Sequence, residues 1–147
     1  MIAKAQLDHY YLPGEIRLQP SVIRRVLEVV DPIAESIASH VEMQDLRDVV
    51  MTGCGDSLFS AMAAAFSFIR ISGRLTVPLH ALEYSRGFYR SSIPRTLVCA
   101  LSYSGETRRT LGAVTPARTR GAQSLASTAD REGSIARVDH PVLPHVS

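Results

Sequence analysis

Short apolar runs that alternate with helical stretches constrain the fold of this chain more than any other feature. The runs are apolar on both faces, which is typical of parallel strands covered by helices on both sides. The pattern predicts an α/β protein with a doubly wound, five-stranded parallel sheet of the flavodoxin-like type. The predicted strands are residues 48–52, 75–81, 95–101, 122–128 and 139–144.

The segment before the first run has a helical pattern instead. Apolar residues recur at helical spacing from Val22 to Val41, with Ser21 as a predicted cap. Asp31-Pro32 resembles a second helix start, and residues 1–20 look irregular. We therefore expect an N-terminal helical arm over residues 1–45. We expect residues 46–147 to form a single domain that ends just after the fifth strand.

Two prolines inside the predicted elements carry further expectations. Pro78 lies in the second strand and predicts an edge position or a bulge, because proline cannot donate to a sheet ladder. Pro116 lies in the helix predicted over residues 106–120 and predicts a kink or a break.

Glycine and hydroxyl side chains gather in two loops that follow predicted strands. "GCGDS" at residues 53–57 follows the first strand, and "SYSGET" at residues 102–107 follows the third. Ligands of parallel α/β sheets bind beyond the carboxyl ends of the strands. Glycine permits close backbone approach, and the N–H groups and dipole of the next helix favour an anion. The loops therefore predict a phosphate site at this edge.

Each loop also has a plainer interpretation. Ser and Thr are common helix caps, and a lone Gly-x-Gly is weak evidence for a site. The first loop lacks the third glycine of a dinucleotide fingerprint, and no Gly-Lys-Ser/Thr of a Walker A motif occurs. The second loop is the stronger indication, because three hydroxyls exceed what one cap requires.

The composition of the chain argues against several classes of protein. Lys4 is the sole lysine, which leaves almost no candidate for Schiff-base chemistry. Residues 1–45 carry four basic and seven acidic side chains, so we expect no nucleic-acid partner.

Cys54 and Cys99 are interpreted as reduced thiols, and no signal peptide or membrane-spanning run is present, so we expect a cytoplasmic protein without a membrane partner. No side-chain cluster has metal-ligand spacing, and we predict no metal and no cofactor.

The motif series "GCGDS…ALEYSRGFY…LSYSGETRRTL" resembles the SIS (sugar isomerase) domain family. The likeness is greatest to the first of the two such domains in glucosamine-6-phosphate synthases, also called glutamine–fructose-6-phosphate aminotransferases. It covers nearly the whole chain, from "DHYYLPGEIRLQPSVIRRVL" to "PVLP".

The resemblance implies a phosphosugar site. Ser57, Ser102, Ser104 and Thr107 would hold the phosphate, and Cys54 and Gly55 would line the sugar. The whole implied binding set is Gly53, Cys54, Gly55, Asp56, Ser57, Ser102, Tyr103, Ser104, Gly105 and Thr107.

Two members of this set depart from the synthase pattern. Asp56 and Tyr103 stand where the synthase has threonine and glutamine, which favours a substrate other than fructose 6-phosphate. A carboxylate repels a phosphate dianion, so Asp56 should point away from it.

The resemblance also bears on catalysis. Glu106 and Glu83 match positions near the family pocket and are the candidate catalytic residues, with His80 and His9 as further candidates for a general base. The glutamate, histidine and lysines that act in the synthase belong to its second SIS domain, and this sequence holds neither that domain nor a glutaminase domain.

We therefore expect a phosphosugar-binding SIS domain of a sugar-phosphate isomerase or of an aminotransferase/deglycase-type enzyme, acting on a ketose, aldose or amino-sugar phosphate. A homodimer or higher homo-oligomer would complete the pocket. Two alternatives stay open: a non-catalytic sugar-phosphate sensor, and an incomplete half of an enzyme with two SIS domains. Whether the isolated chain is catalytic stays open too, with an isomerase-like enzyme favoured.

Overall fold

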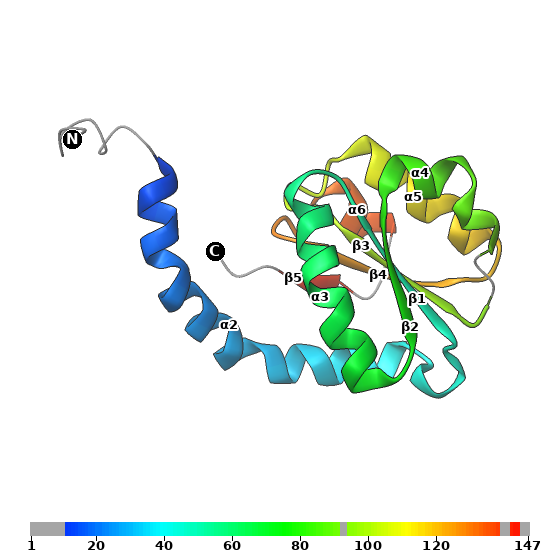
Figure 1. Cartoon of the computed structure of the whole chain (residues 1–147), viewed down its shortest axis with the longest axis horizontal. Helices are drawn as coiled ribbons and strands as arrows, with labels where there is room; N and C mark the ends of the chain where they lie inside the picture. The colour runs from blue at the N-terminus through cyan, green and yellow to red at the C-terminus, as the bar shows by residue number, and fades with distance from the viewer. Residues whose placement is uncertain (1–10, 92–93, 139–141, 145–147) are drawn as a thin grey trace.

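A long helix leads into an α/β domain (Figure 1). The computed structural model describes residues 11–91, 94–138 and 142–144. The helix α2 (Tyr11–His40) forms the arm, and a short 3-10 turn (Met43–Asp45) joins it to the first strand. Among the described residues, no helix combines the length and the apolar character needed to cross a bilayer.

The domain is built on one parallel sheet of five strands in the order β2-β1-β3-β4-β5. The strands are β1 (Asp48–Gly53), β2 (Leu75–His80), β3 (Thr96–Leu101), β4 (Gln123–Thr128) and β5 (Val142–Pro144). All four neighbouring pairs are parallel. The predicted α/β fold with its five-stranded parallel sheet is thus confirmed, and β2, which contains Pro78, is an edge strand.

Successive residues of a strand point to opposite faces of the sheet, so each strand supplies apolar side chains to both faces. Helices cover both of these faces. Val49 and Met51 of β1 pack in a cluster with Ala61 of α3 (Asp56–Ser72). Val50 packs in a cluster on the other face, with residues of α4 (Ala81–Arg86) and α5 (Arg108–Thr119) such as Ala113. A third cluster joins α5 and β4 to Ile135 of α6 (Ser134–Val138).

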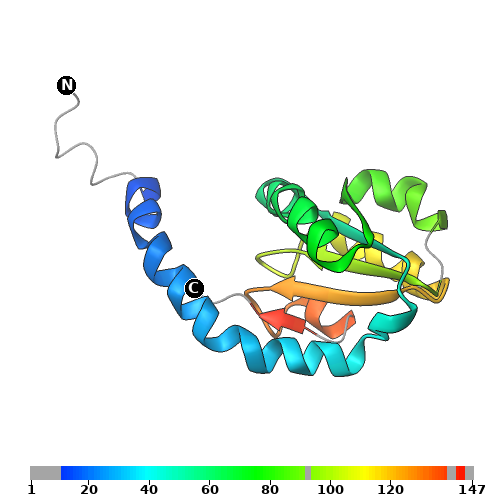
Figure 2. The same cartoon turned by 60° about the horizontal axis from the view of Figure 1, so that its bottom comes forward.

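The arm differs from the prediction in one respect. One continuous helix runs from Tyr11 to His40 through Pro20 and Pro32, where we expected irregular chain up to residue 20 and a new helix start at Asp31. A proline inside a helix removes one backbone hydrogen bond. When the residues on both sides continue the helical pattern, the helix bends at the proline and does not end there. Figure 1 shows the arm as a bent helix, and Figure 2 shows its last turns passing beside β5. Residues 1–10 lie outside the described part.

Two helices differ from what the sequence analysis expected, the first by lacking a break at Pro116 and the second by being present at all. The helix α5 runs on unbroken through Pro116 to Thr119. The helix α6 was not predicted, since five residues are too few to show a helical period.

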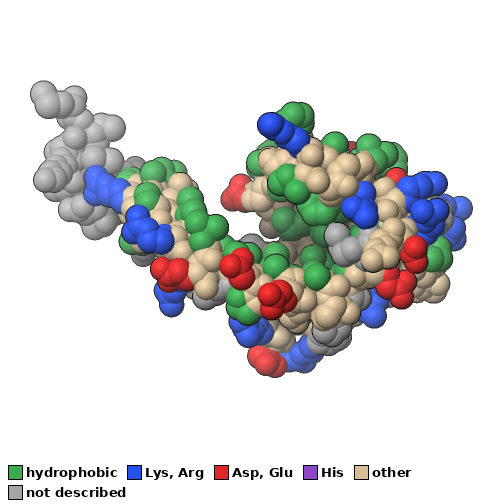
Figure 3. All heavy atoms as spheres, turned by 90° about the horizontal axis from the view of Figure 1, so that it is seen from below, with side chains coloured by type: hydrophobic (Ala, Val, Ile, Leu, Met, Phe, Trp, Pro, Cys, Tyr) green, Lys and Arg blue, Asp and Glu red, His purple; other side chains and the backbone are tan. Residues whose placement is uncertain are grey.

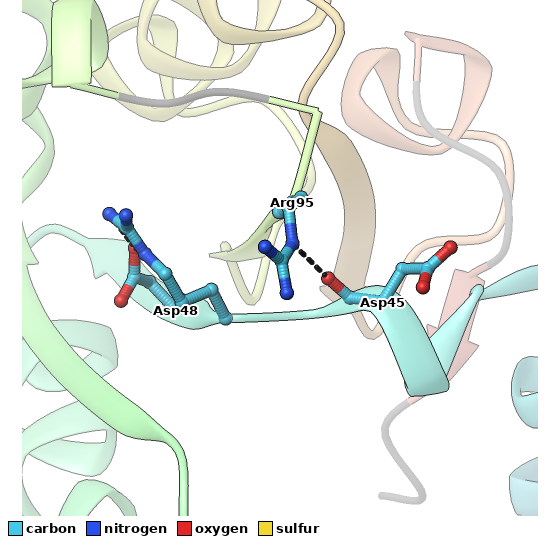
Figure 4. Close-up of polar contacts among 4 residues, drawn as sticks. Asp45, Asp48 and Arg95 are labelled. Carbon is cyan, nitrogen blue, oxygen red and sulfur yellow. Dashed lines mark hydrogen bonds and ion pairs between the residues drawn. The ribbon is translucent and has the colours of Figure 1, made fainter.

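Polar contacts fix the amino edge of the sheet, at the end opposite the two loops. The Nε of Arg95 donates to the carbonyl oxygen of Asp45 at 3.0 Å, as Figure 4 shows. The backbone N–H of Arg47 donates to the carbonyl oxygen of Arg95 at 2.8 Å. Arg47 also pairs with the Asp48 carboxylate at 2.8 Å. These bonds join the exit of the arm to the start of β3.

Candidate functional site

The two glycine- and hydroxyl-containing loops lie next to each other at the carboxyl edge of the sheet. Strands β1 and β3 are neighbours, and Gly53 of β1 pairs in register with Leu101 of β3. A Cβ added to Gly53 would lie 2.9 Å from the Cβ of Ser57 and 3.0 Å from the carbonyl oxygen of Leu101. Glycine at this position therefore lets the first turn of α3 close over the strand ends.

The first loop delivers Ser57 at the start of α3. Gly55 has φ +55°, a conformation that favours glycine, and α3 begins at the next residue. The N–H groups of Leu58 and Phe59 donate to the carbonyl oxygen of Gly55 at 2.9 and 3.2 Å. The half-buried Ser57 thus sits in the first turn of a helix, where the dipole favours an anion.

The second loop forms its own hydrogen bonds before α5 begins. The hydroxyl of the buried Ser102 donates to Oγ1 of Thr107 at 3.0 Å. Thr107 caps α5 by position, without a side-chain cap bond. Because each hydroxyl carries one proton and this bond uses one of the two, the pair keeps one hydroxyl proton available for a ligand. The Oγ of the exposed Ser104 accepts from the N–H of Glu106 at 3.3 Å.

The segment between β4 and α6 holds the second loop in place. The carbonyl oxygen of Tyr103 accepts from the N–H of Ala129 at 3.0 Å and from Oγ1 of Thr128 at 3.2 Å. Gly105 has φ +70°, and a Cβ added there would lie 3.2 Å from the Cα of Gly133. The N–H of Ile135 then donates to the carbonyl oxygen of Gly105 at 3.0 Å. These contacts fix the conformation of the second loop.

The carboxylate of Glu106 is part of this attachment. One oxygen accepts from the N–H of Ser134 at 2.7 Å, and the other accepts from the Ser134 hydroxyl at 2.7 Å. These two hydrogen bonds lower the pKa of Glu106 below its ordinary value, and the bond from the Ser134 N–H has the larger effect. Glu106 is thus a charged anchor with both oxygens engaged, which makes it a weaker base than a free glutamate.

One cleft joins the two loops. It has a volume of about 590 Å³ and is lined by Asp56, Ser57 and Ser60 of α3, Leu101 and Tyr103 of the β3 end, and Glu15 of the arm. Ser57 and Tyr103 come from different loops and share this space. The sequence analysis did not predict Ser60, Leu101 and Glu15 as lining residues. Glu15 in particular could not be predicted, because only the folded chain brings the arm across from α3.

Of the residues predicted to hold the phosphate, Ser57 lines this cleft, whereas Ser102, Ser104 and Thr107 are not among its lining residues. Ser102 is buried beneath the loop surface, whereas Cys54 is half-buried against the cluster between α4, α5 and the sheet. Glu83 is exposed on α4 and does not line the cleft. The Nδ1 of His80 accepts from the N–H of Leu82 at 3.2 Å and caps α4. His9 lies outside the described residues.

A parallel sheet covered on both faces, with a hydroxyl-bearing cleft at its carboxyl edge, defines an α/β ligand-binding domain. The SIS domain family matches residues 42–143 of the chain. Because this match covers well over half of its length, the protein belongs to the SIS domain family, as the motifs predicted.

Relatives of known name agree with this assignment. The isomerizing glutamine–fructose-6-phosphate aminotransferase of Methanococcus maripaludis is 30% identical in an alignment 139 residues long, which covers 90% of this chain and 22% of that enzyme. The chain therefore spans less than a quarter of this relative.

Solved structures share the fold. An Escherichia coli CFT073 protein in complex with A5P superposes with a TM-score of 0.74 at 23% identity, over 99% of this chain and 77% of that one. The Vibrio vulnificus NanR protein complexed with ManNAc-6P gives a TM-score of 0.74 at 19% identity, over 97% of this chain and 54% of that one. At these identities the likeness is one of fold.

Proposed function

We propose that this SIS domain binds a sugar phosphate, with the phosphate held between the two loops. The observation that carries the proposal is the cleft that Ser57, at the start of α3, and Tyr103, just after β3, line together. Two helix N-termini at one edge present N–H groups that have no partner within their helices. Hydroxyls add neutral donors beside them. The ligands in the names of the two similar structures support the same class.

The cleft gives the ligand an orientation. Asp56 is exposed at the first position of α3 and lines the cleft. Its carboxylate repels a phosphate dianion. The phosphate therefore lies toward Ser104 and Thr107, and the sugar lies toward Asp56, whose oxygens accept hydrogen bonds from hydroxyl or amino groups. Tyr103, which is 61% exposed, contributes a ring and a hydroxyl to the sugar side.

The reaction we propose is that of an isomerase or of an aminotransferase/deglycase-type enzyme. Aldose–ketose isomerisation needs a base near the sugar carbons. Glu106 and Glu83 keep their place as candidates, but Glu106 must first release Ser134, and Glu83 must reach the cleft from α4. We therefore expect a second copy of the chain to complete the pocket and supply part of the catalytic machinery.

Calorimetry with a panel of ligands tests the binding proposal. We expect hexose 6-phosphates and pentose 5-phosphates to bind and the unphosphorylated sugars not to bind. The Ser104→Ala/Thr107→Ala double variant should bind at least about 100-fold more weakly, because each of the two lost hydrogen bonds to a charged group contributes about 1.5–3 kcal/mol. The exposed Ser67→Ala on α3 is the matched control. Equal binding of the dephosphorylated sugars would overturn the proposal.

A non-catalytic sensor is the second candidate, and one observation favours it. Among the residues that line the cleft, the ionisable acids are Glu15 and Asp56, while Glu106 is held by Ser134. An isomerisation assay over the same panel separates the two functions. Turnover supports the enzyme, and binding without turnover at any protein concentration supports the sensor or an incomplete half of a larger enzyme.

A further inference from the structure

Tyr103 lines the cleft with a side chain that is 61% exposed, and its backbone is held in place. Its carbonyl oxygen accepts from the N–H of Ala129 at 3.0 Å and from Oγ1 of Thr128 at 3.2 Å. A tyrosine offers a large, rigid contact area, because only two side-chain torsions have to be fixed on binding. A ligand that packs on this ring therefore loses little affinity to ordering of the protein.

The lining of the cleft divides into an apolar part and a polar part. Leu101 at the end of β3 and Tyr103 just after it supply carbon surface. The polar part comes from α3 and the arm and consists of two hydroxyls and two carboxylates, from Ser57, Ser60, Asp56 and Glu15. Among the described residues that line the cleft, there is no lysine, arginine or histidine. The cleft thus offers a ligand a carbon surface and a set of hydrogen-bond acceptors. Figure 3 shows the molecule from below, with hydrophobic surface between the arm and the domain.

The ring form of a sugar divides in the same way. A pyranose ring has C–H groups on its faces and hydroxyls around its rim. The negative face of an aromatic ring attracts such C–H groups, and the contact also removes apolar surface from water. The open chain of the same sugar is flexible and has no extended C–H face. The cleft volume of about 590 Å³ lies in the usual range of small-molecule sites. A ring sugar therefore matches both parts of the lining.

We propose that Tyr103 is a specificity-determining residue, whose ring packs on the C–H face of a cyclic sugar phosphate and selects it over the open chain. The inference rests on the proposed function, because a phosphate held between the two loops brings the sugar beside Tyr103. The rim hydroxyls then turn toward Asp56 and Ser60, which line the same cleft. The glutamine that stands here in the synthase pattern offers an amide and no ring face.

Calorimetry with two ligands that cannot interconvert tests this preference. The locked ring is 1,5-anhydroglucitol 6-phosphate, and the open chain is glucitol 6-phosphate, which has the same number of carbons and the same phosphate. We expect the wild-type chain to bind the locked ring about 10-fold or more tightly than the open chain, as an aromatic contact of ordinary strength provides. This comparison uses no variant, so it stands even if a substitution impairs folding.

Substitutions at Tyr103 assign the preference to its ring. Tyr103→Gln should weaken binding of the locked ring about 10-fold and binding of the open chain less than about 2-fold. Tyr103→Phe keeps the ring and should keep the preference. Phe88→Gln removes an aromatic ring that is 55% exposed and does not line the cleft, and it is the matched control. Because Tyr103 is mostly exposed, its variants should retain the circular dichroism spectrum of the wild type.

Ligand NMR adds a readout that a merely structural role of Tyr103 would not move. Saturation transfer from the protein should be strongest at the axial C–H protons of the locked ring, and Tyr103→Gln should lose this pattern. Equal affinity of the wild type for the two ligands overturns the proposal but leaves the phosphate site standing. So does a folded Tyr103→Gln variant that weakens both ligands equally. If neither ligand binds, the proposed function fails and the inference fails with it.

Discussion

The carboxylate of Glu106 joins the second loop to the start of α6 through two hydrogen bonds of 2.7 Å. The partners are 28 positions apart in the sequence, and Ser134 is the first residue of a helix too short to be predicted. The SYSGET motif gave the position of the glutamate but not its partner. The resemblance to the family suggested that Glu106 acts as a base, whereas its hydrogen bonds show that it holds the second loop against α6.

The pH dependence of this anchor follows from the lowered pKa of Glu106. A carboxyl group whose pKa is lower when folded adds stability above its unfolded pKa and loses it as pH falls through the folded value. We expect Glu106→Gln to lower the melting temperature modestly at pH 7, and the difference from wild type to shrink as the pH falls below about 4. Thermal scans across pH measure this. A difference that is constant with pH would contradict the role of the charge.

Gly105 is the residue that the loop geometry needs most. Its φ of +70° strains any other residue, and a Cβ would approach the Gly133 backbone to 3.2 Å, which is a tight contact. Gly105→Ala should cost about 1–3 kcal/mol of unfolding free energy. Gly112→Ala, in α5 with nothing within 4 Å, is the control and should stabilise by about 0.5–1 kcal/mol. Urea denaturation compares them, and equal effects would rule out the strain argument.

At the scale of elements, the sequence predicted what depends on local pattern. The strands followed from apolar runs bounded by glycine or polar residues, and Pro78 placed β2 at an edge. The sequence analysis predicted too many breaks in the arm, because it treated Pro20 and Pro32 as helix boundaries, as they would be in an isolated helix. Packing along a continuous apolar side outweighs a single lost hydrogen bond. The part played by Glu15 at the cleft depends on the arm's path and could not be read from the chain.

Small residues set how closely α5 packs on the sheet. Ala113 and Ala117 are fully buried in the cluster with Val50, Val98 and Tyr84. Ala113→Leu should cost about 1–3 kcal/mol through overpacking. Thr115→Leu, at an exposed position of the same helix, should change the unfolding free energy by less than about 0.5 kcal/mol. Chemical denaturation of both variants checks this, and a tolerated Ala113→Leu would mean that the interface is looser than described.

At the scale of the whole molecule, the cleft and the exposed apolar side of α3 belong to one surface. The helix α3 places Ser57 in the cleft and Phe59 on the exposed face two residues later. We therefore expect dimerisation and ligand affinity to be coupled. In calorimetry, the folded Phe66→Lys variant should bind a hexose phosphate more weakly than wild type, although Phe66 does not line the cleft. Unchanged affinity in a proven monomer would show that one chain suffices for the site.

The central claim is that two loops from neighbouring strands converge on one phosphate. A ¹⁵N–¹H correlation spectrum of the chain, titrated with a hexose 6-phosphate, tests it directly. The account predicts that the amide signals of Ser57 and Leu58 in α3 and those of Thr107 and Arg108 at α5 move together, with one dissociation constant, and stay still with the unphosphorylated sugar. Movement at one loop alone, or the same movement with both ligands, would contradict it.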